Sequence, residues 1–243
     1  MPLNFGNFIA NSWGRSFIRS CRRELQGLAP DPELVAARIR DSAQAIFDAS
    51  AGSLPDKNAR TIYAYCSLTL AAFREIAAET GDKAKAYEFA RVVFQKSLES
   101  RLRLVMKLWL WFVGDPVGFL SRKSLARIGN RKAGAGMEFD EEKTGETVDL
   151  IVRRCAFHQF FVKHGEPDLT PVVCAFDRFW MDMIDRSSRP IRTERPSTIS
   201  TGGDCCRFRF IRDHDKGDVK PSDVILVQLQ KTPYAVREKP CGV

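Results

Sequence analysis

The first half of the chain repeats apolar residues at spacings of three and four, the period of helices that pack along one face. This period runs through residues 34–49, 59–78 and 83–112. Gly114-Asp115-Pro116 ends the last run, because proline disfavours helical geometry in the residue before it. A shorter helix is expected to follow, to about Ile128. We therefore expect residues 1–130 to form a helical part.

The character of the sequence changes after residues 129–136, whose glycines and basic residues predict a loop. Beyond it, three segments have the β-branched or aromatic richness of strands, and two helices are expected between the first two of them. The expected strands are 147–154, 207–212 and 224–228, and the expected helices are 156–164 and 170–185.

This order predicts an α+β fold, with a helical N-terminal half packed on a small, mainly antiparallel sheet formed by the C-terminal half. We expect one compact domain in which a mixed part, 137–230, carries the site, and 231–243 forms a tail. Neither a strand–GxGxxG–helix unit nor a P-loop is present, which argues against a nucleotide-cofactor fold.

The net charge is +8, and the two halves share it evenly, with 22 basic and 18 acidic residues in 1–150 and 16 and 12 in the rest. An even surplus argues against nucleic acid as a partner. The exception is Arg101 to Lys132, where eight basic residues and several aromatic ones accompany a single acid, Asp115. That segment is either a basic amphipathic surface or a helix whose aromatic side chains enter the core; we favour the second.

No run approaches the ~18 consecutive apolar residues of a membrane span. The first 23 residues lack acids and include four arginines, a composition that suits either a transit peptide or a helix resting on the domain. Seven scattered cysteines argue against a disulfide framework. We expect a cytoplasmic protein that acts on a small-molecule substrate, and a homo-oligomer is compatible with the sequence.

Cys155 is expected where a strand ends and a helix begins. A thiol at a helix N-terminus feels the positive end of the backbone dipole, which lowers its pKa and makes it a better nucleophile. His158, one turn later on the same face, is a candidate proton acceptor. The alternative is that Cys155 is simply a small buried residue.

Cys174 and Asp177 repeat this spacing on the next expected helix. Together with Cys155 and His158 they could hold a divalent metal between two helices, but structural zinc sites prefer four Cys or His ligands. We therefore expect no cofactor, with zinc as the lesser alternative. Asp177 could also pair with a neighbouring base on its own helix.

Gly203 and Asp204 precede the expected strand that contains Cys206 and Arg209. Residues alternate between the two faces of a strand, so one face would carry the Cys206 thiol to the core and the other would offer Arg209 to an anion. The alternative is an ordinary sheet with one wet face.

These segments resemble the L-2-amino-thiazoline-4-carboxylic acid hydrolase family. The resemblance lies in Arg154-Cys155, in Gly165-Glu166-Pro167-Asp168-Leu169, in Cys174-Ala175-Phe176-Asp177 and in Cys205-Cys206-Arg207-Phe208-Arg209-Phe210. Ala156 departs from the proline that family members commonly have after the first of these cysteines.

The resemblance implies hydrolysis of a small carboxylate-bearing cyclic amidine to an N-carbamoyl amino acid with a free thiol. In this interpretation Cys155 or Cys206 attacks the amidine carbon, Asp177 orients or protonates the ring nitrogen, and Arg209 or Arg192 holds the substrate carboxylate. Alternatives are a metal-dependent hydrolase or lyase that uses the same Cys and Asp residues, or a non-catalytic domain that binds a small molecule.

Overall fold

The computed structural model describes residue 5, residues 12–51 and residues 56–218. Four long helices precede the sheet, and side-chain caps define the starts of two of them: Asp56 accepts the N–H groups of Asn58 and Ala59, and Asp82 accepts that of Lys85. These helices are α2 (Ser12–Leu25), α3 (Pro32–Ala51), α4 (Lys57–Thr80) and α5 (Lys83–Phe112). The helical expectation for this half is confirmed.

The rest of the chain combines shorter helices with an antiparallel sheet of order β1-β2-β4-β3. This arrangement confirms the α+β fold class. The helices are α6 (Pro116–Arg122), α7 (Leu125–Ala133), α8 (Ala156–Lys163) and α9 (Leu169–Asp185), and the strands are β1 (Glu138–Thr144), β2 (Thr147–Arg154), β3 (Ile191–Ser197) and β4 (Cys206–Arg212).

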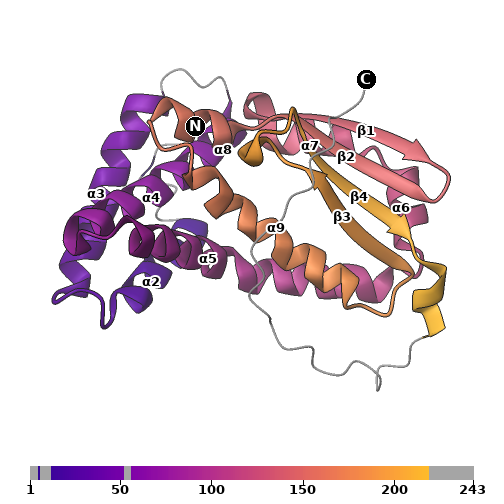
Figure 1. The fold of residues 1–243 in the computed structure, drawn as a ribbon, viewed down its shortest axis with the longest axis horizontal. Helices are drawn as coiled ribbons and strands as arrows, with labels where there is room; N and C mark the ends of the chain where they lie inside the picture. Colours follow the sequence, from indigo (N-terminus) through magenta and orange to yellow (C-terminus); the bar gives the residue numbers. More distant parts are fainter. Residues whose placement is uncertain (1–4, 6–11, 52–55, 219–243) are drawn as a thin grey trace.

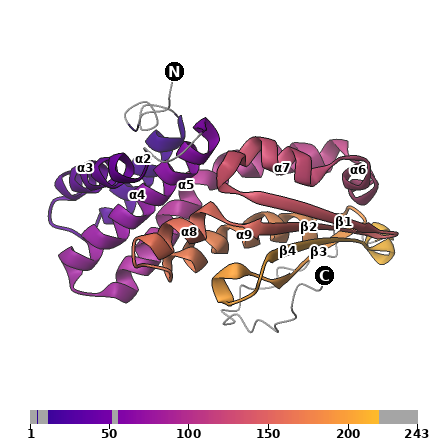
Figure 2. The same ribbon diagram turned by 90° about the horizontal axis from the view of Figure 1, so that it is seen from above.

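Two apolar clusters form the core, and α5 and α9 contribute to both. The first lies among α2 to α5 and includes Phe160, Phe161 and Leu169. The second lies against one face of the sheet, where Trp180 of α9 packs on the rings of Phe208 and Phe210. Figure 1 shows the two helices running from the helical end of the molecule toward the sheet, and Figure 2 shows α6 and α7 beside β1 and β2.

Residues 129–136 are not the loop that their glycines suggest. Residues 129–133 belong to α7, which Ser124 caps, and 134–136 form a short 3-10 helix. Asn130 explains why α7 is stable here, because its side-chain amide bonds both the N–H and the carbonyl of Phe139 on β1. The expected strand 224–228 and tail 231–243 lie outside the described residues.

The favoured interpretation of Arg101 to Lys132 is wrong in part. Trp109 and Phe119 pack against the second cluster as expected, but the side chains of Trp111 and Phe112 stand in solvent, 70% and 73% exposed. Among the described residues no single helix is long and apolar enough to cross a membrane, and α5 with α6 meets the criteria of length and composition only as a pair bent by 98°.

Candidate functional site

Three thiols meet where β2, α8, α9 and β4 come together. Cys155 follows β2 and is the N-cap of α8, Cys174 lies in the second turn of α9, and Cys206 begins β4. All three are free cysteines. They are close enough for each of the other two to raise the pKa of Cys155.

Burial governs the protonation of these thiols. It raises the pKa of Cys155 to about 12, and the backbone N–H groups of His158 and Phe157 offset only part of the effect. It also raises the pKa of Cys174, against the opposing charge of Arg195. Cys155 and Cys174 therefore hold their protons near neutral pH, contrary to the activated thiolate that the helix N-terminus predicted for Cys155.

Arg195 of β3 is the charged centre of the site. Its side chain is only 6% exposed. One terminal nitrogen, Nη1, lies 3.4 Å from the Asp177 carboxylate and donates to the Cys174 carbonyl oxygen at 3.2 Å. The other, Nη2, donates to the Thr198 hydroxyl at 3.2 Å. The guanidinium also lies over the Phe208 ring, 5.0 Å from its centre.

The Nε atom of Arg195 is buried and has no hydrogen-bond partner in the described structure. An unsatisfied buried donor costs about 1–3 kcal/mol, and more on a charged group. Such atoms are rare in folded proteins and call for an explanation. The geometry therefore provides a cationic N–H donor, near the Cys174 and Cys206 thiols, that a bound anion could satisfy.

Thr198 connects Arg195 to Cys206. Its hydroxyl accepts from Arg195 and lies 3.6 Å from the Cys206 sulfur. The sulfur also accepts the backbone N–H of Ile199 at 3.3 Å. The Cys206 sulfur thus lies between the Ile199 N–H, which it accepts, and the Thr198 hydroxyl, to which its thiol donates.

Asp177 completes the cluster. The indole Nε1 of Trp180 donates to its carboxylate at 3.2 Å. Burial raises the pKa of Asp177, and the Arg195 charge and the Trp180 donor offset the rise only in part. Asp177 is therefore better able to hold a proton than an ordinary aspartate, which suits a group that gives a proton to a substrate.

Two predicted residues lie at the edge of this cluster with other partners. The imidazole ring of His158 places Nδ1 3.3 Å from the Thr170 hydroxyl, and in the described structure the ring has no hydrogen bond to a thiol. Gly203 donates its N–H to the Thr198 carbonyl at 3.0 Å, so it holds the turn that carries Thr198. Asp204 is exposed.

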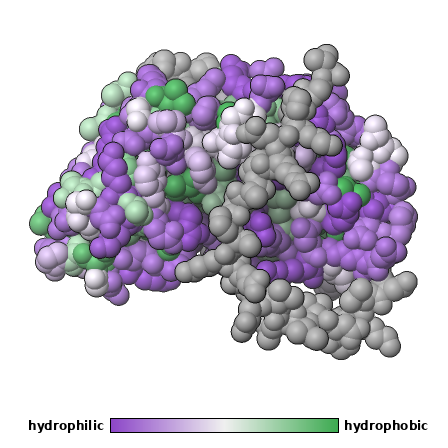
Figure 3. All heavy atoms as spheres, in the orientation of Figure 1, coloured by the Kyte–Doolittle hydropathy of each residue, from purple (hydrophilic) through white to green (hydrophobic). Residues whose placement is uncertain are grey.

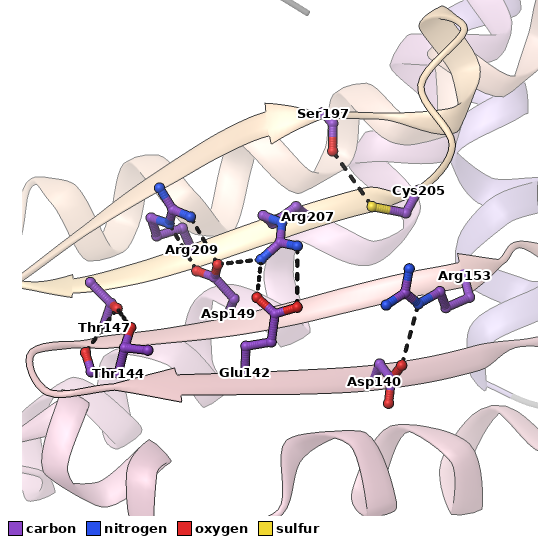
Figure 4. A network of polar contacts seen from close by, with 10 residues as sticks. All are labelled: Asp140, Glu142, Thr144, Thr147, Asp149, Arg153, Ser197, Cys205, Arg207 and Arg209. Atoms are coloured by element: carbon purple, nitrogen blue, oxygen red, sulfur yellow. Dashed lines mark hydrogen bonds and ion pairs between the residues drawn. The ribbon is translucent and has the colours of Figure 1, made fainter. Parts of the chain in front are cut away.

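The predicted arginines point elsewhere. Arg209 binds the Asp149 carboxylate at 2.9 and 3.0 Å, on the sheet face opposite Cys206. Arg207 and Glu142 extend that network, as Figure 4 shows. Arg192 pairs with Glu194, and both are largely in solvent. The structure therefore does not bring Arg209 or Arg192 to the thiols.

Sequence reasoning missed Arg195 and Thr198 because it assigned no strand to residues 191–197. Had residues 191–197 been taken as a strand, the alternation of faces would have placed Arg195 with the buried Ile191 and opposite Arg192. The register shifts between Glu194 and Ser197, where Pro196 cannot donate to the ladder. Such irregularities re-aim side chains, and Thr198 directly follows this one.

The described residues contain no group of three or more His, Cys, Asp or Glu side chains arranged to hold a metal ion. Cys21 and Cys66 lie in the helical core, where Cys66 is near enough to Cys155 for that thiol to raise its pKa. Both are fully buried in the first core cluster, and burial raises the pKa of each thiol.

Comparison with known proteins gives one family. A family model described as L-2-amino-thiazoline-4-carboxylic acid hydrolase matches residues 59–210, a stretch that contains every residue of the site above. No curated protein matches the chain. A crystal structure of Fe(II) unliganded H-NOX protein from K. algicida matches over 71% of this chain and 95% of its own, at 14% identity and a TM-score of 0.28.

The Asp177–Arg195 pair predicts a stability difference between two aspartates of α9. Asp177→Asn would leave the Arg195 charge buried without its carboxylate, so we expect a loss of about 2 kcal/mol, below the usual range for buried pairs because Asp177 is 28% exposed. Asp182→Asn breaks surface pairs with Arg178 and Arg186 and should cost less than about 1 kcal/mol. Urea unfolding at pH 7 measures the free energy of unfolding of both variants. Equal losses would contradict the conclusion that Asp177 compensates a buried Arg195 charge.

Proposed function

The chain belongs to the L-2-amino-thiazoline-4-carboxylic acid hydrolase family, and from that membership we propose that it opens a small carboxylate-bearing cyclic amidine, such as L-2-amino-thiazoline-4-carboxylate, to an N-carbamoyl amino acid. One observation carries the proposal: a buried arginine whose Nε has no hydrogen-bond partner lies near the Cys174 and Cys206 thiols and beside a carboxyl of raised pKa. These groups match a substrate that combines an anion with an electrophilic carbon.

Arg195 is the proposed carboxylate-binding group. Its Nε–H is a charged donor that is already desolvated, so binding a carboxylate there costs no further dehydration of the arginine. Nη1 and Nη2 already have protein partners, which fix the direction of the free N–H. This assignment replaces Arg209 and Arg192, whose charges are neutralised by Asp149 and Glu194.

Cys206 is the proposed nucleophile. Its sulfur receives the Ile199 N–H and lies beside the Thr198 hydroxyl, whereas burial holds the proton on Cys155. The sulfur adds to the amidine carbon while its proton passes to an amidine nitrogen. The bond from that carbon to the ring sulfur then breaks, and the ring sulfur takes up this proton to become a free thiol. Water then displaces Cys206, forming the carbonyl of the N-carbamoyl product and restoring the thiol.

Proton transfer in this scheme needs no histidine. An amidine nitrogen is basic enough to accept the thiol proton directly. Asp177, whose pKa burial raises, can then protonate or orient the ring nitrogen as the charge moves. This explains how a site in which His158 bonds Thr170 can still carry out the reaction.

The thiol mechanism predicts unequal effects of three conservative substitutions. Cys206→Ser should lower kcat by at least about 1,000-fold, because it removes the nucleophile. Cys155→Ser and Cys174→Ser should each retain measurable turnover, since these thiols shape the site without forming a bond to substrate. Mass spectrometry of the N-carbamoyl product measures all three, and circular dichroism confirms that each variant is folded.

The three variants also separate the alternatives. If Cys155→Ser is the inactive variant and Cys206→Ser is active, the attack belongs to Cys155 and the assignment to Cys206 is wrong. Full activity in all three would contradict the thiol mechanism itself. Cys21→Ser serves as the control, because Cys21 is fully buried in the helical core, on α2.

Carboxylate recognition predicts a change in KM at Arg195. Arg195→Lys keeps the positive charge beside Asp177 but removes Nε–H, so KM should rise about ten- to hundredfold while kcat changes much less. The matched control, Arg192→Lys, alters a solvent-exposed arginine of the same strand and should leave KM unchanged. A substrate analogue whose carboxylate is replaced by an amide should bind wild type and Arg195→Lys equally. If Arg195→Lys still prefers the carboxylate over the amide as strongly as wild type does, Arg195 does not bind the carboxylate.

A further inference from the structure

The outer face of the last three turns of α5 is apolar. Its five exposed apolar side chains fall within about a third of the helix circumference. We call this surface the α5 stripe, and it consists of Leu104, Val105, Leu108, Trp111 and Phe112. The stripe is about 12 Å long at the rise of an α-helix. The opposite side of the same turns packs in the second core cluster through Met106, Trp109 and Leu110.

The aromatic end of the stripe is held in place. The rings of Trp111 and Phe112 contact each other with centres 4.6 Å apart. Arg189 donates to the carbonyl oxygens of Leu110 and Trp111, which secures the last turn of the helix. Two large rings that are about 70% exposed on an ordered helix end are unusual for a surface without a partner.

The charges around the stripe are almost all positive. Residues 101–113 contain Arg101, Arg103 and Lys107 and no acid, and Arg103 pairs with Glu99 one turn earlier. Lys107 is exposed at the edge of the stripe. Arg101 lies over the ring of Trp13, on α2, which continues the surface toward the exposed Arg15 and Arg19. Over 101–132 the only acid is Asp115, and Arg212 neutralises it.

We propose that the α5 stripe docks this protein on an anionic lipid surface. An apolar strip with Trp and Phe at one end and Lys and Arg along its edges is the pattern of helices that lie in the membrane interface. Leu104, Val105 and Leu108 would enter the acyl boundary, the two aromatic rings would sit at headgroup level, and the basic side chains would contact lipid phosphates. The helix lies on the membrane and does not cross it.

Charge favours lipid over a second copy of the chain. In a symmetric pair each stripe would face the other, and Lys107 and Arg101 would meet positive charges, with no acid in residues 101–113 to balance them. Nucleic acid would supply negative charge but no apolar phase for Leu104, Val105 and Leu108. An anionic bilayer supplies both the counter-charge and the apolar phase.

Co-sedimentation of the full chain with lipid vesicles tests the proposal. We expect binding to phosphatidylcholine vesicles that contain about one third phosphatidylserine, weaker binding to phosphatidylcholine alone, and a decline as salt screens the charges. Trp111→Ser combined with Phe112→Ser should weaken binding about tenfold or more, and Lys107→Glu should weaken it on anionic vesicles only. The control, Leu34→Ser combined with Val162→Ser, removes exposed apolar side chains elsewhere and should bind as wild type does.

Two results would overturn the proposal. One is a failure of the vesicle test: the wild-type chain binds neither kind of vesicle, or the double variant of Trp111 and Phe112 binds as well as wild type. The other is sedimentation velocity without lipid showing a dimer that the same double variant dissociates, because the stripe would then belong to a second copy. All of these side chains are exposed, so the variants should fold, and unchanged thermal unfolding would verify it.

Discussion

The buried guanidinium of Arg195 is the constraint on which the arrangement of the site depends. A positive charge that is 6% exposed is stable only if its surroundings compensate it. The Asp177 carboxylate and the Cys174 carbonyl oxygen, both on α9, compensate the charge, and the Thr198 hydroxyl, in the turn after β3, accepts a hydrogen bond from the guanidinium. Satisfying Arg195 therefore sets how α9 lies against β3, and with it the distances among the three thiols. The Nε atom has no hydrogen-bond partner in the described structure, and the proposed function assigns the substrate carboxylate to it.

The spacing of apolar residues predicted most of the helices, because the same spacing and the capping residues also suit the packing of these helices in the fold. It missed β1, whose Glu138-Phe139-Asp140-Glu141-Glu142 has low strand propensity. That strand is held by cross-strand contacts that only the fold creates, such as Glu142 with Arg207 and Asp140 with Arg153. It misread α7 for the same reason, since the bonds of Asn130 to Phe139 require β1 to be in place.

The sequence predicted those parts of the candidate site that depend on where strands and helices begin and end. It did not predict those that depend on which strands pair and which charges neutralise each other. Cys155, Cys174, Asp177 and Cys206 lie near enough to one another to interact, and their catalytic roles stay predictions. Face alternation correctly separated Cys206 from Arg209, but Asp149, which neutralises Arg209, becomes visible only once β2 pairs with β4. Burial reversed the expected activation of Cys155, because desolvation outweighs the helix N-terminus. On α5, the same periodicity fits an inward or an outward aromatic face, and only the packing shows that Trp111 and Phe112 point out.

The most direct test of the proposed function is a product assay with L-2-amino-thiazoline-4-carboxylate in isotope-labelled water, using purified protein before and after treatment with a metal chelator. We predict an N-carbamoyl amino acid with a free thiol and one labelled oxygen, formed at the same rate in both samples, because the thiol and Arg195 carry the reaction. Turnover that disappears with chelation would contradict the cysteine mechanism, and no turnover in either sample would contradict the proposed substrate.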